Sequence, residues 1–475
     1  MSGDRTGGGP VTPLPRLVVA APTSGSGKTT VATGLMAALR AAGYEVSGHK
    51  AGPDYIDPGY HALATGRPGR NLDVHLHGED LLAPLLLHGA NAPRPADIAV
   101  VEGMMGLYDG RIGGRGFAST AHVATVLDAP VVLVVDVSRT SRSAAAVVAG
   151  MAVFDRRVRI AGAVLNRAGS DRHAAEVASA LEEIDVPVLG VLRHDERIAA
   201  PSRHLGLVPA QERGESAAAL DRLAERISAQ VDLSAVVDVA RSAPVLRAAA
   251  WSPEAALAAA GRPPASDRGE EPVVAVAGGR AFTFRYAETE ELLRAAGCRP
   301  VVFDPTADSA LPEGTAGIYL GGGFPEVYAA ELSGNTALRT ALLDAVRGGV
   351  PTVAECAGLL YLCREVDGAP MVGALDAVAH MTPKLALAYH SALAPEETLL
   401  AGAGARVSGH EFHRTAVTPT GERSGPAWLL DGRPDGFSAD PAGTGHPTLH
   451  ASYLHTHWAG CPQAAARFAE AVRSR

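Results

Sequence analysis

A glycine-rich segment near the start of the chain carries the residue types of a phosphate-binding loop. The segment APTSGSGKTT, residues 21–30, lies between an apolar run and a stretch with apolar residues at helical spacing. Gly25 and Gly27 would let backbone N–H groups approach phosphate oxygens at a helix N-terminus. Lys28 would reach the β- and γ-phosphates, and Thr29 would bind Mg²⁺. The predicted ATP-binding loop comprises Gly25, Ser26, Gly27, Lys28, Thr29 and Thr30.

Acidic residues follow the strands expected beside this loop. The segment VEGMMGLYDG places Glu102 at the end of an apolar run and Asp109 in the loop that follows. The polar segment HKAGPDYIDPGYH, residues 49–61, adds Lys50, Asp54, Tyr55, Asp57 and His61. Phosphoryl transfer needs carboxylates to hold Mg²⁺ and a cation to stabilise the charge on the γ-phosphoryl group. These residues are therefore candidates for that chemistry, and solvated loop acids are the alternative interpretation.

The sequence around Cys356 is typical of a catalytic nucleophile. The segment VPTVAECAGLLYL predicts a strand, a sharp turn at Cys356 and a helix, which is the pattern of a nucleophile elbow. A helix N-terminus and a nearby imidazole would lower the pKa of this thiol below its free value of about 8.5. The alternative is a buried structural thiol, which is the role we assign to Cys298, Cys363 and Cys461.

Two other segments could complete that site. LHASYLHTHW supplies His450, His455 and His457 as candidate bases. YLGGGFPE, residues 319–326, places three glycines after a predicted strand, so that their N–H groups could form an oxyanion hole.

The composition is that of a folded protein with more than one domain. The chain has 475 residues, of which 47% are hydrophobic and 20% are charged. A net charge of −9 disfavours binding to nucleic acid or to an anionic membrane. Four cysteines without a CxxC pattern argue against a disulfide scaffold and a structural zinc site. The start of the chain has no signal-peptide pattern and no apolar run reaches about 18 residues, so we expect a cytoplasmic protein.

Strand and helix patterns alternate in two separate series. Wholly apolar runs separated by helix-length segments predict α/β domains with doubly wound parallel sheets. We expect a disordered tail over residues 1–15 and an ATP-dependent synthetase domain over 16–240. A partly helical linker over 241–271 and a second α/β domain over 272–475 would follow.

The motifs in this order resemble the cobyrinic or hydrogenobyrinic acid a,c-diamide synthases of corrin biosynthesis. The resemblance extends from about residue 16 to residue 460. The motifs that carry it are APTSGSGKTT, KAGPDYIDPGYH, NLD, VEGMMGLYDG, PSRHLGLVPA, YLGGGFPE, ECAGLLYL and SYLHTHW. It implies an N-terminal domain similar to dethiobiotin synthetase and a C-terminal class I glutamine amidotransferase domain. It also implies that ATP and Mg²⁺ activate the a and c acetate carboxylates as acyl phosphates, and that ammonia from L-glutamine then displaces phosphate.

Carried over to the first half of this chain, the resemblance implies a role for each matching residue. Lys28 and Lys50 would lie beside phosphate. Asp54, Glu102 and Asp109 match acidic synthetase positions. Thr29, Asp54 and Glu102 would bind Mg²⁺, Asp54 and Asp109 would act in catalysis, and Tyr55 and Ile56 would select the carboxylate that is amidated.

In the second half, Cys356 matches the glutaminase nucleophile and His455 matches its general base. The oxyanion hole would be formed by the backbones of Gly322, Gly323 and Ala357. Many class I amidotransferases carry a glutamate two residues after the histidine, but His457 stands there in this chain. The resemblance therefore implies a Cys-His dyad with His457 in a structural role.

Other functions fit parts of the same pattern. Cobyric acid synthase and nickel-sirohydrochlorin a,c-diamide synthase share both domains, and a regulatory P-loop ATPase would retain only the first activity. Both hydrogenobyrinic acid and cobyrinic acid fit the carboxylate chemistry. Abundant Ala, Gly and Arg with scarce Lys suggest a GC-rich genome, and this weakly favours the metal-free acid. A homodimer is compatible with the sequence, and we expect a closed ammonia tunnel between the two activities.

Overall fold

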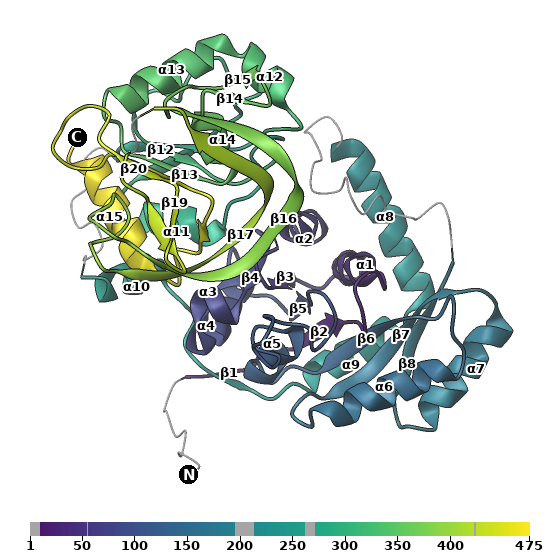
Figure 1. Cartoon of the computed structure of the whole chain (residues 1–475). Coiled ribbons are helices and arrows are strands. Elements are labelled where there is room, and N and C mark those ends of the chain that lie inside the picture. Colours follow the sequence, from purple (N-terminus) through teal and green to yellow (C-terminus); the bar gives the residue numbers. More distant parts are fainter. Residues whose placement is uncertain (1–9, 55, 195–212, 262–270, 422–423) are drawn as a thin grey trace. The chain divides into compact units, whose positions relative to one another are not determined.

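The computed structural model describes residues 10–54, 56–194, 213–261, 271–421 and 424–475 (Figure 1). The chain divides into two compact units. The first comprises residues up to Val74 together with Gly78–Trp251, and the second comprises His75–His77 together with Ser252–Arg475. Each unit contains its own parallel sheet, which confirms the predicted α/β class with parallel sheets. Among the helices that the structure describes, none has the length and apolar character needed to span a bilayer.

The first unit is built on a seven-stranded sheet in the order β4-β3-β5-β2-β6-β7-β8, in which every pair is parallel. Strands β2, β5 and β6 are buried throughout or nearly so, as the apolar runs predict. The strands are β2 (Arg16–Ala20), β3 (Val46–Ala51), β4 (Arg70–Leu72), β5 (Ile98–Glu102), β6 (Val131–Asp136), β7 (Ile160–Ala168) and β8 (Val188–Arg193).

Helices cover this sheet. On one face, Leu35 of α1, Ile227 of α8 and Val236 of α9 join a core with apolar residues of β2, β5 and β6. The C-terminal ends of the strands lie where α1 and α2 begin, so this edge collects the loops predicted to bind nucleotide. The helices of this unit are α1 (Lys28–Ala41), α2 (Asp57–Thr65), α4 (Glu79–Asn91), α5 (Thr120–Val126), α6 (Ser143–Phe154), α7 (Asp171–Glu182), α8 (Arg213–Gln230) and α9 (Leu233–Arg241). The short helix α3 (Val74–His77) begins in this unit, and its last three residues belong to the second unit.

Two segments expected to be irregular contain regular structure. Strand β1 (Val11–Thr12) pairs antiparallel with β9 (Leu246–Arg247), so the predicted disordered tail over 1–15 is wrong for its last residues. Helix α10 (Pro253–Ala259) lies in the segment predicted as a linker, and Ser252 caps it by accepting a hydrogen bond from Ala255 N. The boundary between the two units falls at residues 251 and 252, inside that predicted linker.

The second unit contains a six-stranded sheet in the order β11-β10-β12-β13-β21-β20. All of its pairs are parallel except β20–β21. Its strands are β10 (Val273–Ala277), β11 (Arg299–Phe303), β12 (Thr315–Leu320), β13 (Thr352–Glu355), β20 (Phe437–Ala439) and β21 (Leu449–Ser452). Its helices include α11 (Ala287–Ala295), α12 (Ala329–Gly334), α13 (Thr336–Arg347), α14 (Ala357–Leu362) and α15 (Pro462–Arg473).

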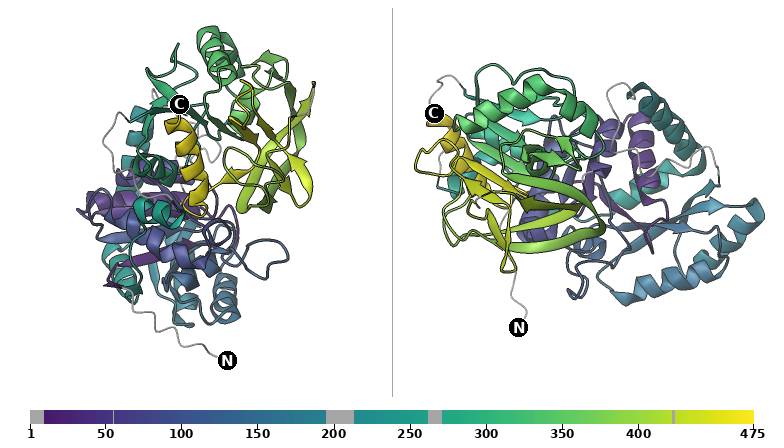
Figure 2. Two further views of the ribbon diagram at one scale, coloured as in Figure 1. Left: turned by 90° about the vertical axis from the view of Figure 1, so that its left-hand side faces the viewer. Right: turned by 45° about the horizontal axis from the view of Figure 1, so that its top comes forward.

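A second, mostly antiparallel sheet in this unit has no counterpart in the sequence prediction. Its centre is the long pair β16 (Ala377–Leu393) and β17 (Arg406–Pro419), drawn as paired green strands in Figures 1 and 2. Strand β17 also pairs with β22 (His455–Thr456), which brings His410 opposite His455. The sheet is completed by β14 (Glu365–Val366), β15 (Ala369–Pro370), β18 (Trp428–Leu430) and β19 (Arg433–Asp435).

Candidate functional sites

The phosphate loop joins β2 to α1 in the conformation that glycine allows. Gly25 and Gly27 have φ angles of 80° and 92°, in the left-handed region that other residues rarely adopt. A Cβ atom at Gly27 would lie 2.2 Å from Nδ2 of Asn166. That amide also donates a hydrogen bond of 2.9 Å to Ser26 O. Asn166, near the end of β7, therefore fixes the position of the phosphate loop through this hydrogen bond.

A buried cluster of charged side chains lies beside the loop. Lys50 and Glu102 are register partners at the ends of β3 and β5. Glu102 Oε1 accepts hydrogen bonds from Thr29 Oγ1 at 2.6 Å and from Lys50 Nζ at 3.1 Å. Asp57 Oδ2 lies 2.5 Å from Lys50 Nζ, and His61 Nε2 lies 2.7 Å from Glu102 Oε2. Two carboxylates, one ammonium group and one hydroxyl thus converge at the start of α1.

Burial and mutual charge shift the pKa values in this cluster. Burial alone would raise the pKa of Glu102, but Lys50 and His61 outweigh it and hold that pKa well below its usual range. Burial and the Glu102 charge raise the pKa of Asp57 to about 8. Burial would lower the pKa of Lys50, yet the Glu102 and Asp57 carboxylates raise it overall. Burial, followed by the Lys50 charge, lowers the pKa of Lys28.

The structure brings together only some of the predicted acidic residues. Thr29 and Glu102 are in contact, but Asp54 Oδ1 accepts hydrogen bonds from the backbone N–H groups of Ile56 at 2.8 Å and Asp57 at 3.2 Å. Asp57, rather than Asp54, is therefore the second carboxylate at Lys50 and Thr29. Tyr55, predicted to select the carboxylate, lies outside the described residues.

Asp109 is part of the loop after β5, where its Oδ2 accepts a hydrogen bond of 3.0 Å from Gly106 N. Lys28 donates to the carbonyl of Met105 in the same loop. Within the described ranges, no group of three or more His, Cys, Asp and Glu side chains has the geometry to hold a metal ion.

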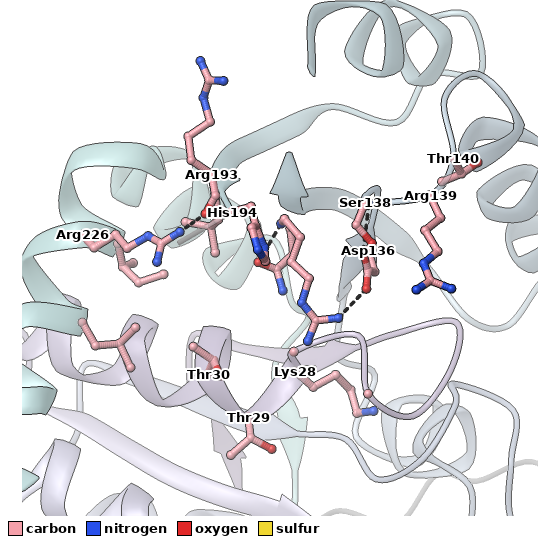
Figure 3. Close-up of a pocket in the computed structure, with 17 residues that line it drawn as sticks. Lys28, Thr29, Thr30, Asp136, Ser138, Arg139, Thr140, Arg193, His194 and Arg226 are labelled. Carbon is pink, nitrogen blue, oxygen red and sulfur yellow. Dashed lines mark hydrogen bonds and ion pairs between the residues drawn. The ribbon is translucent and has the colours of Figure 1, made fainter. Parts of the chain in front are cut away.

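Sequence reasoning assigned no individual role to several residues that the fold brings to the site. Asp57 and His61 are four residues apart on α2, the spacing that places two side chains on one helix face. A cavity of about 1100 Å³ extends from the loop past the ends of β6, β7 and β8 (Figure 3). Its lining includes the predicted Gly25, Gly27, Lys28, Thr29 and Thr30, and also Asp136, Ser138, Arg139, Thr140, Asn166, Arg167, Arg193, His194 and Arg226.

In the second unit, Cys356 occupies a strained turn between β13 and α14. Its φ and ψ angles are 49° and −94°, a conformation rare for a residue with a side chain. The Cys356 N–H donates to Ser452 O at 2.8 Å, and the Gly358 N–H donates to Gly321 O at 3.1 Å. A Cβ atom at Gly358 would lie 2.3 Å from Leu320 O. Close packing against the end of β12 therefore requires a glycine in this turn, as in a nucleophile elbow.

The predicted base, His455, lies on β22 beside the glycine segment. A Cβ atom at Gly322 would lie 2.6 Å from His455 Cε1. The imidazole packs at 4.5 Å from the Phe284 ring and stacks at 5.0 Å on the His410 ring, measured between centroids. Burial, followed by the neighbouring His410, places the pKa of His455 well below its ordinary value. The imidazole is therefore neutral and able to accept a proton.

One of the three predicted oxyanion donors is already occupied. The Gly322 N–H donates to Phe284 O at 3.0 Å, and the Phe284 N–H donates back to Gly322 O at 3.1 Å. The prediction that Gly322 is an oxyanion donor is therefore wrong for this conformation. Gly323 and Ala357 are the two predicted donors left, and the Ala357 N–H is directed at the Cys356 sulfur.

The thiol pKa also differs from the prediction. Cys356 is only 5% exposed, and burial, reinforced by the Glu326 carboxylate, raises its pKa. The N–H of Ala357 at the start of α14 acts in the opposite direction but is outweighed. The neutral His455 adds no positive charge, so the predicted lowering by an imidazole does not occur in this state.

The remaining histidines and cysteines have structural surroundings. His457 Nε2 lies 3.4 Å from Glu288 Oε2. His450 is buried near Trp428, and its pKa is lowered to about 3 by burial. Cys363 Sγ lies 3.3 Å from Leu359 O within α14 and the residue after it.

Comparison with known proteins identifies both halves. Residues 17–208 match the family described as the CobQ/CobB/MinD/ParA nucleotide binding domain, and residues 273–462 match the CobB/CobQ-like glutamine amidotransferase domain. The chain therefore joins a P-loop nucleotide-binding domain to a glutamine amidotransferase domain, and this combination defines an ATP-dependent ligase that uses glutamine as nitrogen donor.

Full-length relatives define the group more narrowly. The chain is 79% identical to the hydrogenobyrinate a,c-diamide synthase of Thermobifida fusca, over 100% of this chain and 99% of the relative. It is 54% identical to that of Streptomyces coelicolor, over 97% and 98%. It is 42% identical to the cobyrinate a,c-diamide synthase of a Synechococcus strain, over 96% and 98%. The chain belongs to the hydrogenobyrinate and cobyrinate a,c-diamide synthase family.

Proposed function

We propose that this protein amidates the a and c acetate carboxylates of hydrogenobyrinic acid with ATP and glutamine, in the cytoplasm. The observation that carries the proposal is that one chain has both a phosphate loop next to a buried acidic cluster and a strained cysteine turn next to a neutral histidine. ATP would convert each carboxylate into an acyl phosphate, and ammonia would attack the acyl carbon and release phosphate. The 79% identity to a hydrogenobyrinate enzyme supports the metal-free acid as substrate.

The first unit would perform the phosphoryl transfer. Lys28 and Lys50 would stabilise the charge that develops on the transferred phosphoryl group. The Thr29 hydroxyl and the Glu102 carboxylate, 2.6 Å apart, are hard oxygen donors of the kind that Mg²⁺ prefers, and they would hold it together with phosphate oxygens. Held there, the ion would supply positive charge that offsets the charge of the phosphates. Asp57 is a further acidic residue of this cluster. Like Glu102, it would pair with the Lys50 ammonium group.

Asp54, Asp109 and Ile56 keep the roles implied by the family resemblance, as part of the acceptor side of the synthetase site. Asp54 and Ile56 belong to the turn before α2, and Asp109 belongs to the loop after β5. The cavity past the ends of β6, β7 and β8 would hold the nucleoside part of ATP, because it begins at the phosphate loop and exceeds the volume that such a ligand requires.

The second unit would release ammonia from glutamine. The Cys356 thiol would give its proton to His455 while the sulfur attacks the amide carbon, and the Gly323 and Ala357 N–H groups would stabilise the oxyanion. The imidazolium would return that proton to the leaving nitrogen as the C–N bond breaks, which leaves a glutamyl thioester. Water would then hydrolyse the thioester to glutamate and regenerate the thiol.

The test uses the purified protein with Mg-ATP, glutamine and either hydrogenobyrinic or cobyrinic acid, and counts acid-to-amide exchanges by mass spectrometry. Two exchanges, with matching release of ADP and glutamate, support the proposal, and the acid with the higher kcat/KM identifies the metal state of the substrate. Four exchanges on a diamide would identify a cobyric acid synthase instead. ATP hydrolysis without any exchange would contradict amidation of either acid and favour a regulatory ATPase or a sirohydrochlorin substrate.

A further inference from the structure

Glu355, the last residue of β13, is a buried carboxylate immediately before the nucleophile. It is only 3% exposed. Its Oε2 accepts a hydrogen bond of 2.8 Å from the Tyr319 hydroxyl. Its Oε1 accepts two more from Thr456, at 2.9 Å from the hydroxyl and 3.2 Å from the backbone N–H. A buried carboxylate with three donors is held in one orientation.

These partners connect the three elements of the glutaminase site. Tyr319 lies on β12, which leads directly into the glycine segment that supplies the oxyanion donor. Thr456 follows His455 on β22. Glu355 itself is bonded through the chain to Cys356. One carboxylate therefore links the nucleophile, the base and the oxyanion segment, and its Oε2 lies 4.0 Å from His455 Nδ1.

We propose that Glu355 is a positioning residue for glutamine hydrolysis, whose carboxylate orients the His455 imidazole through Nδ1 and stabilises it when it carries the Cys356 proton. The inference rests on the proposed glutaminase function. A carboxylate next to the second imidazole nitrogen fixes the tautomer that can accept a proton at Nε2. His457, two residues after His455, is paired with Glu288, so the acidic partner here comes from the strand before the nucleophile instead.

The ionisation of Glu355 gives this role a pH signature. Burial raises its pKa to about 7, although the hydrogen bonds from Tyr319 and Thr456 act in the lowering direction. His455 is neutral over the same range because its pKa lies far below. Glutaminase activity should therefore rise as the pH increases through about 7 and Glu355 becomes charged. The titratable groups around Glu355 and His455 are Tyr319, Cys356, Cys461, His410, Glu411 and His413.

The first variant is Glu355→Gln, which keeps the shape and an acceptor oxygen but removes the charge. We expect its glutaminase kcat to fall by about 10²-fold or more with a smaller change in KM, because the imidazolium loses its partner. The rise in activity near pH 7 should disappear. Amidation with ammonium salts in place of glutamine should stay close to the wild-type rate. Glutaminase activity within threefold of wild type, or an unchanged rise near pH 7, would overturn the proposal.

Two further variants separate positioning from structural support. Tyr319→Phe removes a hydrogen bond that lowers the pKa of Glu355, so the rise in activity should move to higher pH while kcat at high pH is largely kept. Glu326→Gln is the matched control, since Glu326 is another carboxylate near Cys356 whose pKa is raised by burial. The rise near pH 7 should persist in this variant, and its loss there would assign the signature to Glu326 and overturn the proposal.

If Glu355→Gln fails to fold, Tyr319→Phe still tests the positioning role of Glu355. A pH profile of glutaminase activity that is the same in Tyr319→Phe as in wild type would contradict that role. Failure of the proposed function gives a different result. The wild-type protein would then release no glutamate from glutamine at any pH, whereas failure of this inference alone leaves wild-type glutaminase activity intact.

Discussion

At the scale of single residues, Asp57 is the side chain whose role the fold changes most. It shares Lys50 with Glu102 and lies 3.3 Å from the Thr29 hydroxyl. Asp57→Asn should lower ATP-dependent amidation by about 10²-fold above pH 8, where Asp57 is ionised and is one of the two carboxylates that orient Lys50 toward phosphate. ADP release measures this effect. Glutamine hydrolysis should stay unchanged, and Asp238→Asn, a 77% exposed carboxylate on α9, should leave both activities unchanged.

The same carboxyl group makes stability depend on pH. The pKa of Asp57 is about 8 in the folded protein against an ordinary value of 3.8, so the folded state binds the proton more tightly than the unfolded chain. The stability that comes from this tighter proton binding is therefore fully present below about pH 4 and is lost as the pH rises from about 4 to about 8. The free energy of unfolding of Asp57→Asn, relative to wild type, should increase between pH 5 and pH 8. Urea titrations at both pH values measure it, and a constant difference would contradict the shift.

At the scale of elements, the phosphate loop depends on glycine at one position for two reasons. Gly27 has a positive φ angle, and a Cβ atom there would lie 2.2 Å from the Asn166 amide. Gly27→Ala should therefore displace the loop and weaken ATP binding by about tenfold or more, as measured by calorimetry. Gly150→Ala in α6 is the matched control, because no atom lies within 4 Å of a Cβ there. That change should keep ATP affinity and raise stability by up to about 1 kcal/mol.

The sequence patterns predicted some strands of the fold and not others. The apolar runs predicted β2, β5 and β6 because the middle residues of these strands are buried and are all apolar. Strand β3 had no such signal, since its buried residues include His49 and Lys50, the latter held by site carboxylates. The pair β16–β17 was missed because its exposed and half-buried residues follow no strict alternation.

The observed surroundings of the site residues differ from the sequence expectations for one physical reason. The motifs located the correct segments, but each role depended on a hydrogen bond or on burial that only the folded chain specifies. Asp54 bonds to the turn before α2, and the Gly322 N–H bonds to Phe284, a residue 38 positions earlier in the chain. The pKa of Cys356 is raised by burial, which a linear pattern does not report.

At the scale of the whole molecule, glutamine chemistry and ATP chemistry belong to separate compact units. Cys356→Ala should abolish glutamine-dependent amidation, a loss of about 10³-fold or more, because the thioester cannot form. Ammonium salts should restore amidation, with a larger effect at higher pH where more free ammonia is present. The readout is amide formation by mass spectrometry. Cys363→Ala, at the buried cysteine after α14, should keep the glutamine-dependent reaction, and a failure of ammonium rescue would contradict the separation of roles.

The buried state of Cys356 has a consequence for chemical durability. Peroxide and alkylating agents react with thiolates that are exposed to solvent. The Cys356 thiol is neither ionised nor exposed, because its pKa is raised and only 5% of the residue is exposed. The resting protein should therefore resist conversion of its nucleophile to sulfenic acid.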